Sequence, residues 1–133
     1  MKIAVRPVAL AALLGLSAMS ASDGAAQTPA LGRLMREKLA HSEKVLEAIM
    51  TSDYASLQRH SEDLIRVTES PVWSVLKSPE YIRHSAAFLR ATQDLVKAAA
   101  DRDFDAATMH YVSLTLSCYQ CHRYIKNRRI AGQ

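Results

Sequence analysis

The chain has 133 residues, of which 49% are hydrophobic and 23% are charged, and its formal net charge is +4. This length fits a single globular domain. The charge is only mildly basic and does not indicate a nucleic-acid-binding protein. The only two cysteines, Cys118 and Cys121, lie three residues apart, a spacing that suits a disulfide poorly.

The N-terminus has the pattern of a secretory signal peptide. Lys2 and Arg6 form a basic n-region, and residues 8–19 form an apolar h-region that is too short to span a bilayer. Small residues follow. We therefore predict a signal peptide over residues 1–26 and a mature domain over residues 27–133, with no membrane span after cleavage. Such a signal predicts export, which in a bacterium means a periplasmic protein.

The mature sequence shows helical periodicity and no strand-like alternation. The four predicted helices cover residues 31–50, the stretch from the Ser52-Asp53 cap to residue 69, the stretch from the Ser78-Pro79 cap to residue 100, and residues from about 103 to beyond the cysteines. Pro71 closes the second helix. Short links between amphipathic helices predict an all-α, antiparallel, up-down-up-down four-helix bundle.

The apolar positions of each helix predict the face that it buries. For the first helix these are Leu31, Leu34, Met35, Leu39, Leu46 and Ile49, with Arg36, Glu37, Lys38, Glu43 and Lys44 outside. For the next two helices they are Tyr54, Leu57, Leu64 and Val67, and then Tyr81, Phe88, Leu95 and Ala99. For the last helix they are Phe104, Ala107, Tyr111, Leu114 and Ile125, on the same arc as the two cysteines.

The sequence Cys118-Tyr119-Gln120-Cys121-His122 has the C-x-x-C-H pattern of c-type haem attachment. Two thiols add across the two vinyl groups of the porphyrin, and the adjacent imidazole supplies the proximal iron ligand. On a helix the three reactive side chains fall within an arc of about 100°. The motif therefore predicts one covalent haem c, with its iron, on the last helix.

Other uses of this motif fit the sequence less well. A C-x-x-C redox pair usually begins a helix in a βαβ unit, whereas Cys118 and Cys121 lie deep inside a helical pattern. A structural zinc site needs four Cys or His ligands, and no second cluster accompanies these residues.

The remaining histidines are interpreted as structural. His60 and His84 lie near the apolar faces of their helices, where a partly buried, hydrogen-bonded imidazole is expected. His41 and His110 are expected on solvated flanks.

The mature chain resembles the class II cytochrome c family, which includes cytochrome c′. The resemblance consists of the four helices, the link Pro71-Val72-Trp73 between the second and third, and the haem motif near the end of the last. It implies that Cys118 and Cys121 form the thioethers and that His122 is the fifth iron ligand. The family often continues with x-x-Tyr-Arg, whereas Tyr124 here stands one position earlier.

The resemblance places a residue of the first helix opposite the iron. Met35 in that position gives a six-coordinate iron and an electron carrier. Leu39, four residues later, leaves the iron open to small ligands such as NO or CO. Both interpretations remain open from the sequence, although a methionine on a helix face is often a core residue.

The favoured function is a periplasmic electron carrier that exchanges single electrons with redox partner proteins. The alternative is a protein that binds NO or CO at a five-coordinate haem. An enzyme of the peroxidase type is not expected, because Met35, Leu39 and Ser42 offer no distal acid–base group. The resemblance also implies a homodimer formed through the outer faces of the first two helices.

Overall fold

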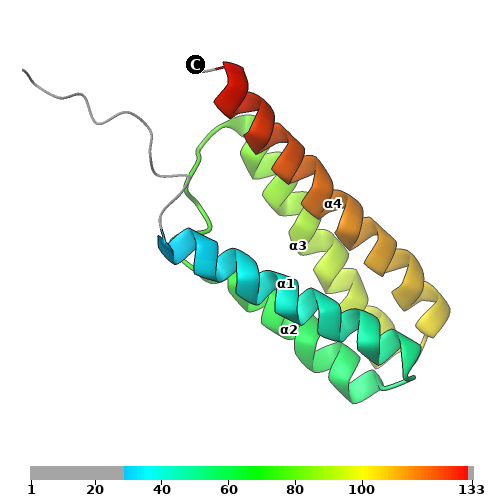
Figure 1. Cartoon of the computed structure of the whole chain (residues 1–133). Coiled ribbons are helices and arrows are strands. Elements are labelled where there is room, and N and C mark those ends of the chain that lie inside the picture. Colours follow the sequence, from blue (N-terminus) through cyan, green and yellow to red (C-terminus); the bar gives the residue numbers. More distant parts are fainter. Residues whose placement is uncertain (1–28, 132–133) are drawn as a thin grey trace, which may run out of the picture.

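The structure is a computed structural model that describes residues 29–131, apart from the side chains of residues 129 and 130. Its four helices are α1 (Pro29–Met50), α2 (Tyr54–Glu69), α3 (Pro79–Ala100) and α4 (Phe104–Ala131), and they run alternately up and down (Figure 1). The predicted all-α four-helix architecture is confirmed. The predicted signal peptide, residues 1–26, lies outside the described residues.

Polar side chains at the helix starts explain where the helices begin. The Asp53 carboxylate accepts a hydrogen bond from the Ser56 amide at 2.9 Å, and the Ser78 hydroxyl accepts one from the Tyr81 amide at 3.3 Å. Pro79 follows as the first residue of α3. Each cap satisfies an amide that has no partner within its helix, so both predicted caps are confirmed.

Two short links at one end of the bundle have the same design. Ser52 and Arg102 adopt the left-handed conformation, with φ of 58° and 55°. The residue after each donates its amide to a carbonyl five residues earlier, at 2.9 Å in both links, which ends the preceding helix. The aromatic residues that follow, Tyr54 and Phe104, stack with their ring centroids 3.8 Å apart. This stack joins the start of α2 to the start of α4.

The buried face of α1 differs from the predicted one. The buried residues are Leu34, Lys38, Val45, Ala48 and Ile49. Leu39 and Leu46 are 57% and 41% exposed, and Lys38 is only 7% exposed, so the predicted placement of these three is wrong. The buried positions recur at steps of four and three residues, and Leu39 is one residue, or about 100° of rotation, away from that line.

The buried faces of the other helices follow the prediction closely. Leu57, Leu64 and Val67 of α2 are buried, and so are all four predicted positions of α3. On α4, Ala107 and Leu114 are buried, while Phe104 and Tyr111 are partly buried against the core.

The helices pack in sequence order, α1 on α2, α2 on α3 and α3 on α4, and these three contacts are extensive. The contact between α1 and α4, which closes the ring, is much smaller. The link between α2 and α3 runs past the end of the bundle where α1 begins and α4 ends (Figure 1). Within residues 29–131, no helix combines the length and apolarity that crossing a membrane requires.

Candidate functional site

The C-x-x-C-H motif lies on the inward side of α4. Its cysteines continue the line of Ala107, Tyr111 and Leu114 at steps of four and three residues. Both thiols are free and partly buried, and Cys118 packs against the hydrophobic core. His122 is adjacent to this line and more exposed. The helix therefore directs two partly buried thiols inward, with the imidazole of His122 at the more exposed edge of the same arc.

Aromatic side chains form the wall beside this motif. Trp73, from the link after α2, is buried, and its ring centroid lies 5.2 Å from that of Phe88 on α3. Tyr81 of α3 donates its hydroxyl proton to the Trp73 carbonyl, which fixes the link against the bundle. Burial, together with the charge of the nearby Cys121 thiol, raises the pKa of Tyr81. Trp73 therefore packs the link onto the core of the domain.

Lys38 extends from α1 into this same region, a placement that the sequence did not predict. Its Nζ atom lies 5.6 Å from the Trp73 ring centroid and 5.3 Å from that of Phe88. Its positive charge acts on both Cys121 and His122. No carboxylate within residues 29–131 pairs with it. A lysine that is only 7% exposed and has no acidic partner is unusual, and such groups are often functional.

The protonation states of the motif follow from its partial burial. Desolvation raises the pKa of the Cys121 thiol, with a smaller contribution from Cys118, while Lys38 opposes this shift. Desolvation lowers the pKa of His122, and Lys38 adds to the effect. A lowered pKa favours the neutral imidazole, which is the form that ligates a metal.

The donor set fits a covalent porphyrin. Two unpaired thiols and an imidazole lie on one arc of one helix, and the tilted rings of Trp73 and Phe88 lie on the wall beside them. The hydroxyl oxygen of Ser85 is buried without a hydrogen-bond partner among the described residues, although it is close enough to lower the pKa of Tyr81 slightly. An orphaned polar atom near Tyr81, which itself is close to Cys121, is consistent with a site that takes a further group.

The two predicted distal residues occupy different environments. Met35 is partly buried and packs against the core. Leu39, one turn after Met35, is 57% exposed. Met35 and Lys38 are three residues apart and therefore on neighbouring positions of one helix face. Whether either of the predicted residues stands opposite an iron stays a prediction.

Tyr124 has a structural role next to the motif. Its hydroxyl shares a hydrogen bond of 2.8 Å with Ser78, the cap of α3, and its ring centroid lies 5.5 Å from that of His84. Arg128 donates a hydrogen bond to the same hydroxyl at 3.3 Å. These contacts hold the end of α4 against the start of α3. His84 is partly buried, as expected.

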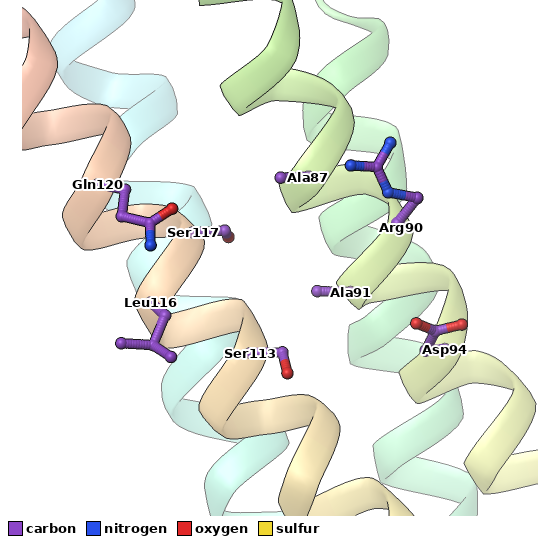
Figure 2. A pocket seen from close by; sticks show the side chains of 8 residues that line it. All are labelled: Ala87, Arg90, Ala91, Asp94, Ser113, Leu116, Ser117 and Gln120. Carbon is purple, nitrogen blue, oxygen red and sulfur yellow. The ribbon is translucent and has the colours of Figure 1, made fainter.

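A shallow groove of about 310 Å³ lies on the outside of α3 and α4, away from the reactive side chains of the motif (Figure 2). Small residues on both helices, Ala87 and Ala91 opposite Ser113 and Ser117, line its floor. Arg90 and Asp94 lie at its rim. None of the three haem-motif side chains contributes to this groove.

A second polar cluster joins α1 to α2 and was also missed from the sequence. His41 was expected on a solvated flank, but its side chain is 24% exposed and contacts His60 and Asp63 of α2. Because α1 and α2 are antiparallel, residues far apart in the sequence meet at this seam. The rotation of α1 that buries Lys38 also brings His41 to α2.

Comparison of the chain with family models, with curated proteins and with solved structures found no match.

Proposed function

We propose that this protein is a c-type cytochrome that carries single electrons through one covalent haem. Cys118 and Cys121 form the thioethers, and His122 supplies the proximal ligand. The observation that supports this most strongly is the position of both free thiols on the buried line of α4, with the imidazole beside them. When bound, the haem supplies a one-electron couple between ferric and ferrous iron.

The chain's own residues would bind the porphyrin and exclude water from it. Trp73 and Phe88 provide an apolar wall, and the α2–α3 link that carries Trp73 is held by the Tyr81 hydrogen bond. The limited contact between α1 and α4 leaves these helices free to separate around a flat group. Burial of the iron in an apolar setting is one of the means by which a protein tunes a redox potential.

The function depends on which side chain of α1 faces the iron. Met35 is the candidate from the family resemblance, and Lys38 is the candidate that the structure adds, because its Nζ acts on both Cys121 and His122. Lys38 acts electrostatically on both Cys121 and His122, so it would lie near the part of the haem that these two residues would hold.

A closed, six-coordinate site with either residue supports electron transfer. An open site, with Leu39 or another non-ligating residue nearest the iron, supports the alternative of NO or CO binding. A periplasmic location, redox partner proteins and membership of the class II cytochrome c family are parts of the same proposal. We also propose that the protein acts on no substrate of its own and is not an enzyme.

The experiment is to export the full chain from a bacterium that makes c-type cytochromes and to extract the purified protein with acid acetone. We expect a Soret band that stays with the polypeptide. The Cys118→Ala/Cys121→Ala variant should lose it, whereas His110→Ala, a histidine remote from the motif, should keep it. A purified chain without covalently retained iron porphyrin overturns the proposal.

Ferric and ferrous spectra of the same sample, with and without CO, then separate the two functions. Low-spin spectra that CO does not alter indicate an electron carrier. High-spin spectra with rapid CO or NO uptake indicate a gas-binding protein.

A further inference from the structure

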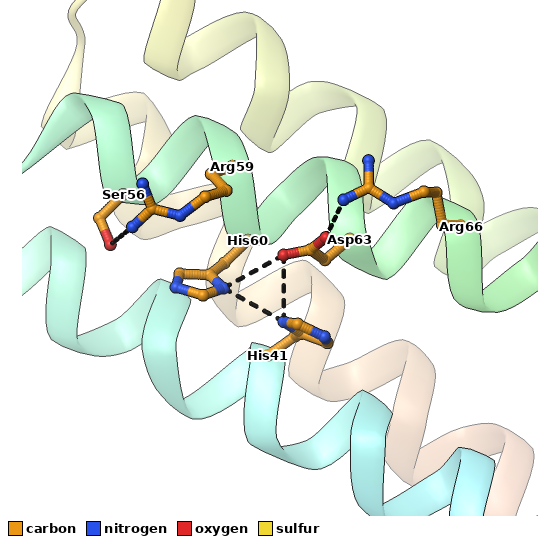
Figure 3. A network of polar contacts seen from close by, with 6 residues as sticks. All are labelled: His41, Ser56, Arg59, His60, Asp63 and Arg66. Carbon is orange, nitrogen blue, oxygen red and sulfur yellow. Dashed lines mark hydrogen bonds and ion pairs between the residues drawn. The ribbon is translucent and has the colours of Figure 1, made fainter.

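The cluster at the α1–α2 seam places three ligand atoms at the corners of a nearly equilateral triangle (Figure 3). His41 Nδ1 lies 3.1 Å from His60 Nδ1 and 3.3 Å from Asp63 Oδ2. His60 Nδ1 lies 3.4 Å from the same carboxylate oxygen. Nothing in the proposed haem chemistry uses these residues.

These distances match one face of a tetrahedral coordination shell. Zinc binds imidazole nitrogen and carboxylate oxygen at about 2.0 to 2.1 Å, so two ligand atoms of a tetrahedral zinc ion are separated by about 3.3 Å. An octahedral ion with bonds of similar length brings adjacent ligand atoms to about 3.0 Å. Calcium and magnesium prefer oxygen ligands alone. We propose that His41, His60 and Asp63 form a zinc-binding site that clamps α1 to α2.

Hydrogen bonds alone do not satisfy all three ligand atoms of this cluster. If both Nδ1 atoms carry protons, two donors face each other across 3.1 Å. If only one carries a proton, the other presents a lone pair towards the Asp63 carboxylate, 3.3 or 3.4 Å away. A cation at the centre is attracted to all three lone pairs at once.

A neighbouring arginine orients the Asp63 carboxylate towards the two imidazoles. Arg66 bonds the other oxygen of Asp63, so Oδ2 remains directed at the two imidazoles (Figure 3). Such contacts from outside the coordination shell orient metal ligands. The side chains of His60 and Asp63 are each 18% exposed, which leaves one side open for a water molecule as the fourth ligand.

The chain offers a matched control in its other His–carboxylate pair. His110 Nδ1 lies 3.8 Å from Asp94 Oδ2, with no third ligand among the described residues. It contains the same kinds of group but cannot enclose an ion. Replacement of His110 therefore tests whether any histidine near a carboxylate is enough to bind zinc.

The test is calorimetric titration of zinc sulfate into the chelator-treated full-length protein, with or without attached haem. We expect one zinc ion per chain in the wild type and in the Cys118→Ala/Cys121→Ala variant, which removes thiols that could bind zinc themselves. The double variant distinguishes failure of the zinc site from failure of the proposed haem function, because a chain that never receives haem should still bind zinc at the seam.

His41→Ala and Asp63→Asn should each weaken zinc binding at least about tenfold, and His110→Ala should leave it unchanged. Asp63→Asn preserves the size of the side chain, and circular dichroism confirms that each variant keeps its helices. Absence of saturable zinc binding in the wild type overturns the inference. Wild-type affinity in the His41→Ala/His60→Ala variant, or equal weakening by His110→Ala, overturns it as well.

Discussion

Replacement of Lys38 by leucine should stabilise the haem-free chain. Lys38 is 7% exposed, and its amine lies over the faces of Trp73 and Phe88 without an acidic partner among the described residues. Burial of an ion costs several kcal/mol, and each cation–π contact returns about 0.5 to 2 kcal/mol. Leucine fills similar space without a charge, so we expect the free energy of unfolding of the Cys118→Ala/Cys121→Ala background to rise by about 1 to 3 kcal/mol.

The same substitution should change the iron coordination of the haem-loaded protein if the amine faces the iron. Lys38→Leu cannot ligate, so the ferric spectrum should move from low spin to high spin and CO should bind the ferrous form. Lys44→Leu is the control, because Lys44 is on the same helix but exposed and paired with Glu47 at 2.6 Å. Lys44→Leu should leave the spectrum unchanged. It should change the free energy of unfolding by no more than a few tenths of a kcal/mol.

Urea unfolding followed by circular dichroism measures the first effect, and absorption and EPR spectra measure the second. An unchanged spectrum in Lys38→Leu, together with loss of the low-spin signal in Met35→Ala, would assign the distal position to Met35. Lower stability of the haem-free Lys38→Leu chain would refute the reasoning about the buried amine, because its ring contacts would then outweigh its desolvation.

Three further substitutions test other parts of the fold. Ser61→Ala should raise the free energy of unfolding by about 1 kcal/mol, because the Ser61 hydroxyl is fully buried and has no partner within residues 29–131; a loss of stability in urea unfolding would reveal a missed partner. Ser52→Gly should raise it by a similar amount, since Ser52 has a φ of 58° and a left-handed residue with a side chain costs about 1 to 2 kcal/mol; Ser52→Ala should bring no such gain. The large exposed apolar side chains of the described residues lie on α1, α3 and α4 but not on α2, so a homodimer should bury α4 rather than α2. Gel filtration should therefore show fewer dimers for Leu116→Glu than for Gln58→Glu on α2, and the reverse order would favour the α1–α2 face.

The architecture was predictable because local signals agreed with one another. Asp53 and Ser78 mark helix starts, and the apolar residues of α2 and α3 recur with a single clear phase. Cys118 and Cys121 fall on the same line as Leu114, so the inward direction of the thiols followed from the helical period alone.

The phase of α1 was not predictable in the same way. Its leucines lie on more than one side, and assigning every leucine to the core moved the predicted face towards Leu39 and Leu46. Packing against α2 selects the line through Leu34, Lys38 and Val45 instead. The steps of four and three residues that relate Leu34 to Val45 pass through Lys38. Following those steps would have predicted that Lys38 is buried, although a lysine is not expected in the interior.

The contact of His41 with His60 and Asp63 depends on the antiparallel register of α1 and α2, which no local pattern encodes. His60 and Asp63 are on one face of α2 because they are three residues apart. The residue that meets them from α1 is fixed by the tight link at Ser52, which aligns the two helices. A pairing of this kind follows from the assembled bundle and not from either helix alone.

Lys38 and His41 are three residues apart on α1, which separates their directions by about 60° around the helix axis. Lys38 therefore reaches the interior while His41 reaches α2, and the two sites should respond independently. His41→Ala should weaken zinc binding at least about tenfold and leave the haem spectrum unchanged, whereas Lys38→Leu should alter the spectrum and leave zinc affinity unchanged. Zinc affinity and the haem spectrum should therefore both be measured for His41→Ala and for Lys38→Leu. A haem spectrum that changes in His41→Ala would mean that the seam sets the position of α1 over the thiols, and the two sites would then be coupled through the rotation of one helix.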